Sequence, residues 1–296
     1  MTLHPQARRA VAGYADEQKV TDPGYDIDAA RREARAAAAA VPRVELPEVR
    51  DVDADGVPCR YYRPAERTDA VLIHLHGGGF VFNDVEVHDA AVRQFARVLG
   101  IGVLSVDYRR PPEHRFPAAP DDVDTVLAWV RAGGLGEVER IFAHGDSAGG
   151  NLALVAALRN PGAFSGVVLI YPFLDPEAGF DSYRTAAEGF DAAEAAWYWQ
   201  QYAATEADLT DPDLAPLRSE RLATLPPTLV VTAEHDPLRD EGEHLVHLLA
   251  EAGVEVVGSR ALGQIHGFWR HTEVFTAAAP LHRQAAGFVQ MLLERE

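Results

Sequence analysis

The chain has 296 residues, of which 47% are hydrophobic and 24% charged, and 27 Lys and Arg against 45 Asp and Glu give a formal net charge of −18. This acidity argues against nucleic acid and anionic membranes as partners, because both are bound mainly through clustered basic side chains. The length and composition exclude disorder as the main state and are typical of one large α/β domain or two smaller domains.

The single cysteine, Cys59, excludes an internal disulfide and any metal centre built on several cysteines. No stretch reaches the roughly 18 apolar residues of a membrane span, and no apolar run of signal-peptide length follows residues 1–19. We therefore expect a cytoplasmic protein without stable membrane insertion.

The predicted elements begin with a β-hairpin, since segments 43–50 and 57–63 flank the turn signal Asp53-Ala54-Asp55-Gly56. Short apolar runs then alternate with helical stretches. The runs are continuously apolar, which is typical of strands covered on both faces, so we expect a mostly parallel sheet with crossover helices. The predicted strands are 70–75, 101–106, 140–143, 166–170, 228–232 and 254–257, and the predicted helices are 88–99, 117–131, 148–159, 240–252 and 275–293.

One interval, between the strands that end near Tyr171 and begin near Thr228, is too long for a simple crossover. It contains Trp197 and Trp199 in a helical segment, and we interpret it as an inserted lid. The alternative is that these aromatic side chains only pack a peripheral helix onto the sheet.

The sharpest motif is Gly145-Asp146-Ser147-Ala148-Gly149-Gly150, which carries G-x-S-x-G between a predicted strand and a predicted helix. A nucleophile on such a sharp turn needs a strained backbone, and glycines two positions to either side avoid a steric clash. Neither phosphate-loop pattern occurs at this turn. Ser147 is therefore the candidate nucleophile.

A serine hydroxyl needs an imidazole base and a carboxylate that orients this base. His266 is the favoured base because it lies in a glycine-flanked loop after the last predicted strand, and His271 is its rival. Asp236 is the favoured acid because it follows the strand 228–232, where strand ends face the crevice of a parallel sheet. Asp175 is its rival, and Asp236 could also simply cap a helix.

Backbone N–H groups must stabilise the oxyanion that acyl transfer creates. His76-Gly77-Gly78-Gly79 follows the strand 70–75 and offers such groups, and Ala148 offers another beside the nucleophile. His74 and His76 suggest a metal site, but no third ligand is evident in the sequence nearby, so we interpret them as hydrogen-bonding residues.

Taken in order, these motifs resemble those of the hormone-sensitive-lipase family of α/β-hydrolase carboxylesterases. The resemblance spans about residues 70–270. Arg110-Pro111 replaces the usual Leu-Ala of the family after Tyr108-Arg109 and leaves the position of that loop open. The remaining matching segments are His76-Gly77-Gly78-Gly79, Pro112 to Ala119, Gly145 to Gly150, Tyr171-Pro172, Asp236 to Asp240 and Ile265 to Phe268.

The resemblance implies an α/β-hydrolase fold with a helical cap, no metal and no organic cofactor. It also implies a catalytic triad of Ser147, Asp236 and His266, and it favours a homodimer. The implied oxyanion hole has donors at Gly78, Gly79 and Ala148, with Gly77 in the supporting turn.

We therefore predict a serine carboxylesterase that acts through an acyl-enzyme on a small-molecule ester. The same triad would also serve an acyltransferase or an amide hydrolase, and a non-catalytic receptor is a further alternative. No basic group is identifiable near the site, which favours neutral esters, either short-chain or aromatic. The candidate pocket residues are Phe80, Phe82, Phe173, Trp197, Trp199 and Phe268. The predicted core comprises residues 46–175 and 216–296, with cap helices in 1–45 and an inserted cap segment in 176–215.

Overall fold

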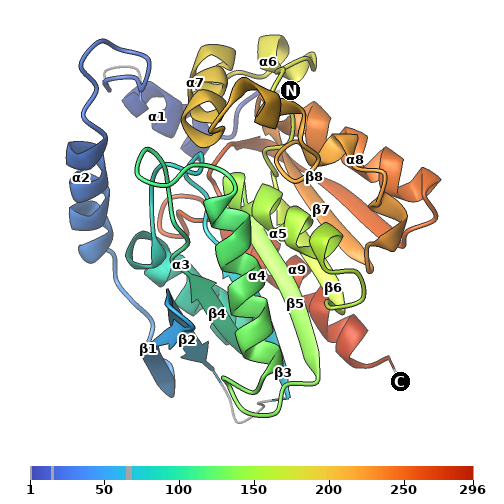
Figure 1. The fold of residues 1–296 in the computed structure, drawn as a ribbon. Coiled ribbons are helices and arrows are strands. Elements are labelled where there is room, and N and C mark those ends of the chain that lie inside the picture. The colour runs from blue at the N-terminus through green and yellow to red at the C-terminus, as the bar shows by residue number, and fades with distance from the viewer. Residues whose placement is uncertain (1, 15–16, 65–68, 296) are drawn as a thin grey trace.

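The computed structural model describes residues 2–14, 17–64 and 69–295. Its centre is an eight-stranded sheet in the order β1-β2-β4-β3-β5-β6-β7-β8 (Figure 1). The first three strands in this order pair antiparallel, and all remaining pairs are parallel, as predicted. The strands are β1 (Glu48–Ala54), β2 (Val57–Arg63), β3 (Ala70–Leu75), β4 (Gly102–Val106), β5 (Arg140–Asp146), β6 (Gly166–Ile170), β7 (Thr228–His235) and β8 (Val256–Ile265).

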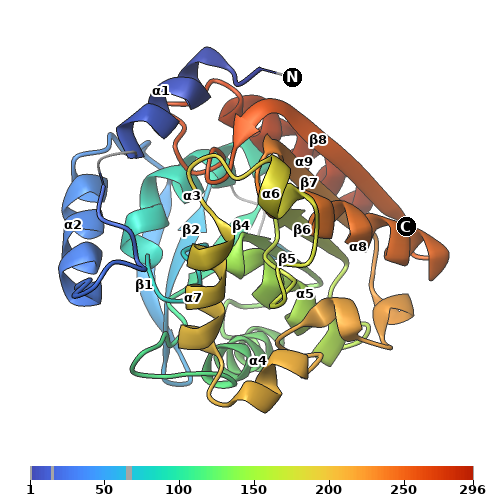
Figure 2. The ribbon, with the colours of Figure 1, turned by 90° about the horizontal axis from the view of Figure 1, so that it is seen from above.

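Helices cover both faces of the sheet, as Figures 1 and 2 show. On one face α3 (Val85–Leu99) packs with α9 (Ala278–Leu293). The other face carries α4 (Ala118–Arg131), α5 (Ala148–Arg159) and α8 (Arg239–Glu251). None of the helices in the described segments is both long and apolar enough to cross a bilayer.

Strand β3 explains why its sequence is continuously apolar. Val71 and Ile73 lie in the core beneath α4 and α5, whereas Leu72 lies in the core beneath α3 and α9. All three side chains are buried, because successive residues of a strand point to opposite faces and both faces are covered.

The last strand differs from its prediction. Segment 254–257 was too short and began too early, since β8 runs from Val256 to Ile265. It lies at the edge of the sheet, and its first half alternates between exposed and half-buried residues. Polar residues such as Ser259 and Arg260 therefore belong to the strand, and continuous apolarity does not mark it.

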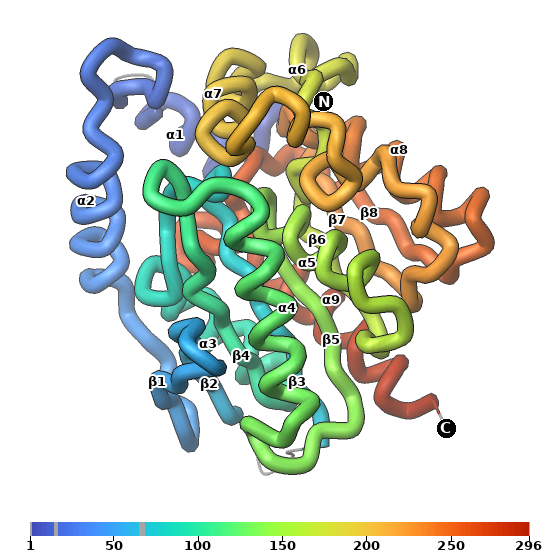
Figure 3. Tube along the Cα trace, viewed as in Figure 1, coloured from blue at the N-terminus to red at the C-terminus, as the bar shows by residue number. Residues whose placement is uncertain are grey.

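Four helices lie toward the carboxyl ends of the parallel strands or beside them. In Figure 3 the trace of α1 (Pro5–Tyr14), α6 (Ser182–Thr185) and α7 (Ala192–Tyr202) lies above the sheet, and α2 (Ile27–Ala39) lies to one side. Short 3-10 turns follow α7 at Glu206–Thr210, Pro216–Arg218 and Leu222–Thr224. The segment that contains Trp197 and Trp199 is thus helical, as expected.

Cys59 provides a test of the packing of β2. Its side chain is buried, and this burial, with contributions from the Asp107 and Asp53 charges, raises the thiol pKa to about 12. Because the thiolate is the reactive form, we expect folded protein to react negligibly with the thiol reagent DTNB near pH ~8, and chain unfolded in guanidinium to react fully. Fast release of the coloured thiol from folded protein would contradict this burial.

Candidate active site

Ser147 stands on the sharp turn between β5 and α5. Its backbone has φ 56° and ψ −120°, a conformation that is strained for a residue with a side chain. A Cβ atom on Gly145 would lie 2.0 Å from the carbonyl oxygen of Gly149, and one on Gly149 would lie 1.9 Å from that of Leu75. Both glycines are therefore required sterically, which is the reason predicted for the motif.

The side chains of Ser147, His266 and Asp236 form one hydrogen-bonded chain. His266 Nε2 lies 2.9 Å from Ser147 Oγ, and His266 Nδ1 lies 2.8 Å from Asp236 Oδ2. With the proton on Nδ1, His266 donates to the carboxylate and Nε2 accepts from the hydroxyl. Asp236 is fully buried, and its other oxygen accepts from the Leu238 N–H at 2.9 Å.

The two rival residues lie in other contacts. Asp175 accepts hydrogen bonds from the N–H groups of Glu177 at 3.0 Å and Gly179 at 2.8 Å, within its own turn. His271 contacts the guanidinium of Arg270, with 3.0 Å between His271 Nε2 and Arg270 Nη2. One detail of the His266 prediction was wrong, because residues 263–265 belong to β8 and the loop begins only at His266.

The glycine turn after β3, Gly77-Gly78-Gly79, borders the same cavity as Ser147 and His266. Gly77 donates its N–H to Asp146 Oδ1 at 2.9 Å, and its carbonyl accepts from Asn83 Nδ2 at 3.0 Å, so Gly77 is a supporting residue. Gly78 and Gly79 line the cavity with φ 128° and 58°. Ala148 is the first residue of α5, where a backbone N–H has no partner within the helix. These three N–H groups are the candidate oxyanion donors.

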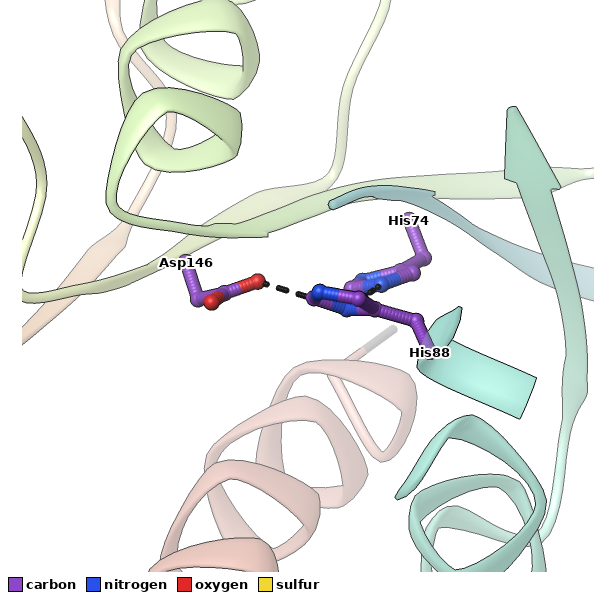
Figure 4. Close-up of side chains that lie close together, drawn as sticks. All are labelled: His74, His88 and Asp146. Atoms are coloured by element: carbon purple, nitrogen blue, oxygen red, sulfur yellow. Dashed lines mark hydrogen bonds and ion pairs between the residues drawn. The ribbon is translucent and has the colours of Figure 1, made fainter. Parts of the chain in front are cut away.

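A buried cluster of imidazoles lies behind the turn (Figure 4). His74 Nε2 lies 3.4 Å from His88 Nδ1, which lies 3.7 Å from Asp146 Oδ1, and all three side chains are buried. The sequence prediction missed this grouping, because it paired His74 with His76 and saw no third ligand. His76 lies beyond the end of β3, and its ring instead stacks on Tyr108 with 4.2 Å between centroids.

These three groups approach one another as metal ligands would. Burial lowers the pKa of His74 to about 3 and that of His88 well below its usual range, and the Arg270 charge lowers the pKa of His88 further. The same charge repels a divalent cation, and His74 already shares a 2.9 Å hydrogen bond with His144. We therefore interpret the cluster as neutral imidazoles that support β3 and Asp146.

Ser147 and His266 open into a cavity of about 540 Å³. Of the six predicted pocket aromatics, Phe82 and Phe173 line it. The other four are not among its lining residues. Trp197 and Trp199 pack behind the wall, with ring centroids 6.1 Å from Phe82 and 4.3 Å from Phe173, whereas Phe80 stacks on Tyr202 at 3.8 Å and Phe268 lies 5.9 Å from Tyr171.

Several further cavity residues were missed from the sequence, and three of them matter for the chemistry. Tyr198 of α7 also lines the cavity, and its ring would lie 2.1 Å from a Cβ atom on Gly79. Lys19 and Arg270 line the wall as well, which corrects the expectation that no basic group stands near the site. Arg270 follows His266 closely in the chain, and this proximity is the one sequence signal that pointed to it.

Comparisons with known proteins agree with this geometry. A sequence model of a family described as having the alpha/beta hydrolase fold matches residues 72–270. The chain is 33% identical over 283 residues to an arylesterase of Saccharolobus solfataricus, covering 90% of this chain and 92% of that protein. It is 35% identical over 240 residues to an ethyl acetate hydrolase of Pseudomonas putida, covering 76% of each.

Solved structures give the same result. A hyperthermophilic esterase from the archaeon Pyrobaculum calidifontis superposes with a TM-score of 0.89 at 35% identity, covering 99% of both chains. An esterase described as belonging to the bacterial hormone-sensitive lipase family superposes with a TM-score of 0.88 at 26% identity, again over 99% of both chains.

Proposed function

Because this chain belongs to the α/β-hydrolase fold family, among its hormone-sensitive-lipase-like carboxylic ester hydrolases, we propose that it cleaves esters as a serine carboxylesterase. The observation that carries the proposal is the chain of hydrogen bonds from Asp236 through His266 to Ser147, at 2.8 and 2.9 Å, which opens into the cavity. Ser147 is the nucleophile, His266 the general base and Asp236 the group that orients His266.

In the first half-reaction Ser147 Oγ attacks the ester carbonyl carbon and passes its proton to His266 Nε2. The carbonyl oxygen becomes an oxyanion and accepts hydrogen bonds from the N–H groups of Gly78, Gly79 and Ala148, each worth about 10²–10³-fold in rate. His266 then donates its proton to the departing alcohol, which leaves Ser147 acylated. Water repeats the sequence with His266 as base, and the carboxylic acid departs.

Residues 1–45 and 176–215 would together form the cap over a core of residues 46–175 and 216–296. In support, both segments contribute to the cavity wall, through Tyr14 and Lys19 from the first and Asp191 and Tyr198 from the second. Lys19 Nζ lies 2.7 Å from Asp191 Oδ2, so an ion pair joins the two segments.

The proposed substrates are short-chain or aromatic esters. A cavity of about 540 Å³ with Phe82, Phe173 and Tyr198 on its wall suits a small apolar acyl or alcohol group. We expect kcat/KM for p-nitrophenyl esters to be highest for short acyl chains such as butyrate and to fall for long ones. A steady rise of kcat/KM up to palmitate would contradict this assignment.

Covalent labelling tests the acyl-enzyme mechanism directly. A fluorophosphonate should modify the protein stoichiometrically, and mass spectrometry of the digest should find the adduct on Ser147 alone. Prior incubation with a slowly hydrolysed ester should protect this residue. An adduct on another residue, or none, would refute Ser147 as nucleophile.

An acyltransferase or amide hydrolase would give the same label. Product analysis separates these alternatives: with p-nitrophenyl butyrate and an added alcohol or amine, an esterase yields mainly butyrate, and an acyltransferase yields mainly the new ester or amide. Turnover of a butyramide at a rate similar to that of the ester would instead favour an amide hydrolase.

A further inference from the structure

Arg270 lies on the wall of the active-site cavity, and within the described part of the chain its guanidinium bonds only to uncharged acceptors. Nη1 donates to Asn83 Oδ1 at 3.2 Å, and Nη2 donates to His271 Nε2 at 3.0 Å. Burial, together with the Arg270 charge, lowers the pKa of His271, so this acceptor is neutral. A guanidinium carries five N–H donors, and these two bonds use two of them, so three have no acceptor among the described residues.

The other cation of the wall is already paired. Lys19 Nζ lies 2.7 Å from Asp191 and 3.6 Å from Glu194, and its side chain is half exposed. Among the described residues Arg270 therefore differs from Lys19 in having no carboxylate within ion-pair distance, although burial raises the pKa of Asp146 and the Arg270 charge partly offsets this rise. A partly buried guanidinium gains most from a carboxylate that binds two of its nitrogens.

The position of Arg270 relates it to the reacting ester. Arg270 follows shortly after His266 in the sequence. It donates to the side-chain oxygen of Asn83, and the side-chain nitrogen of Asn83 donates to the carbonyl of Gly77 in the glycine turn after β3. A ligand group bound to this guanidinium would thus lie beside the glycine turn after β3. A small substrate whose carbonyl faces Ser147 could place such a group there.

The acidic side chains of the wall limit the charge that such a ligand can carry. Asp191 and Glu194 pair with Lys19, Glu188 lies 3.1 Å from His235 Nδ1, and Asp146 accepts from the Gly77 N–H at 2.9 Å. Glu17 lies at the exposed rim. Arg270 would offset the charge of one substrate carboxylate, whereas a second carboxylate would face these acidic groups without a cation of its own.

We propose that Arg270 is a carboxylate-binding subsite, and that the enzyme prefers small esters that carry one carboxylate a few bonds from the scissile carbonyl. This inference rests on the proposed function of Ser147 as nucleophile. It also changes the expected substrate, because the preference for neutral esters depended on the absence of a basic group near the site.

Matched ester pairs test the subsite. Monoethyl glutarate places a carboxylate on the acyl side and O-acetylglycolate places one on the alcohol side, and the uncharged control for each is its carboxamide. For at least one pair, kcat/KM of the carboxylate should exceed that of the carboxamide by about 10- to 100-fold, the worth of a charge-assisted hydrogen-bonded pair. Arg270→Gln should bring this ratio close to one, and Arg270→Lys should keep part of it.

Arg115→Gln is the matched control, because the Arg115 guanidinium donates to the carbonyls of Gln200 at 3.1 Å and Ala203 at 3.0 Å and does not line the cavity. It should leave the ratio within about twofold of the wild-type value. Thermal unfolding verifies that each variant is folded. A wild-type ratio near one for both pairs, or a ratio that Arg270→Gln leaves unchanged, would overturn the subsite.

Binding to the Ser147→Ala variant separates failure of the subsite from failure of the mechanism. Calorimetry with the preferred carboxylate ester should give a Kd about tenfold or more below that of its carboxamide, and the Ser147→Ala/Arg270→Gln double variant should lose this difference. Equal Kd values would overturn the subsite even if Ser147 hydrolyses neutral esters. Conversely, a carboxylate preference in binding without any ester turnover in the wild type would refute only the proposed function.

Discussion

Replacing Ser147 with alanine should lower kcat for p-nitrophenyl butyrate by about 10⁴-fold or more, because no other hydroxyl in the chain of hydrogen bonds can form the acyl-enzyme. Residual turnover would come from His266 and the oxyanion donors acting on water. The fold should survive, since alanine fits the space of serine and only the 2.9 Å hydrogen bond to His266 is lost. Initial rates of nitrophenol release and a thermal unfolding curve measure both effects.

Ser219→Ala is the matched control for this variant. Ser219 is also buried, but its Oγ accepts from the Arg221 N–H at 3.2 Å and it does not line the cavity. We expect its kcat to stay within about threefold of the wild-type value. Should Ser147→Ala retain a kcat within about tenfold of wild type while folded, the acyl-enzyme mechanism would have to be abandoned.

The central strands of the fold were predictable because burial on both faces determines the residue types of each short segment by itself. Strands such as β3 and β6 are buried on both faces, so each is a short apolar run, and the predicted bounds 70–75 and 166–170 match the structure. The elbow at Ser147 was predictable for a related reason. A side chain at Gly145 would clash with the backbone of Gly149, and one at Gly149 would clash with the backbone of Leu75. Both positions therefore require glycine, and this requirement is visible as a fixed pattern in the sequence.

The cavity wall was not predictable in the same way, since it depends on which segments meet in space. Phe80 and Phe82 differ by two positions, yet Phe80 stacks on Tyr202 while Phe82 faces the cavity. Arg270 reaches Asn83 across a large separation in sequence, and no local pattern states whether an arginine will meet a carboxylate. Pairing of charges is a property of the folded chain.

Because Asp236 orients His266, we expect replacement of Asp236 with asparagine to lower kcat strongly. In Asp236→Asn the side-chain amide can donate to His266 Nδ1, and this bond shifts the imidazole proton to Nε2. A protonated Nε2 can no longer accept the proton of Ser147. We expect kcat for p-nitrophenyl butyrate to fall on the order of 10⁴-fold, with KM little changed. The asparagine oxygen can still accept from the Leu238 N–H, so the fold should remain intact.

Asp175→Asn separates this effect from a general loss of a carboxylate near the sheet. Asp175 was the rival acid, and among the described residues its carboxylate bonds only within its own turn, to the N–H groups of Glu177 and Gly179. The asparagine oxygen can keep the bond to Glu177, and kcat should stay within about threefold of wild type. If Asp175→Asn proved the more damaging of the two substitutions, the acid would have to be reassigned. A large loss in Asp236→Asn alone, in protein whose unfolding temperature is unchanged, requires that the carboxylate act through His266 rather than through the helix that follows it.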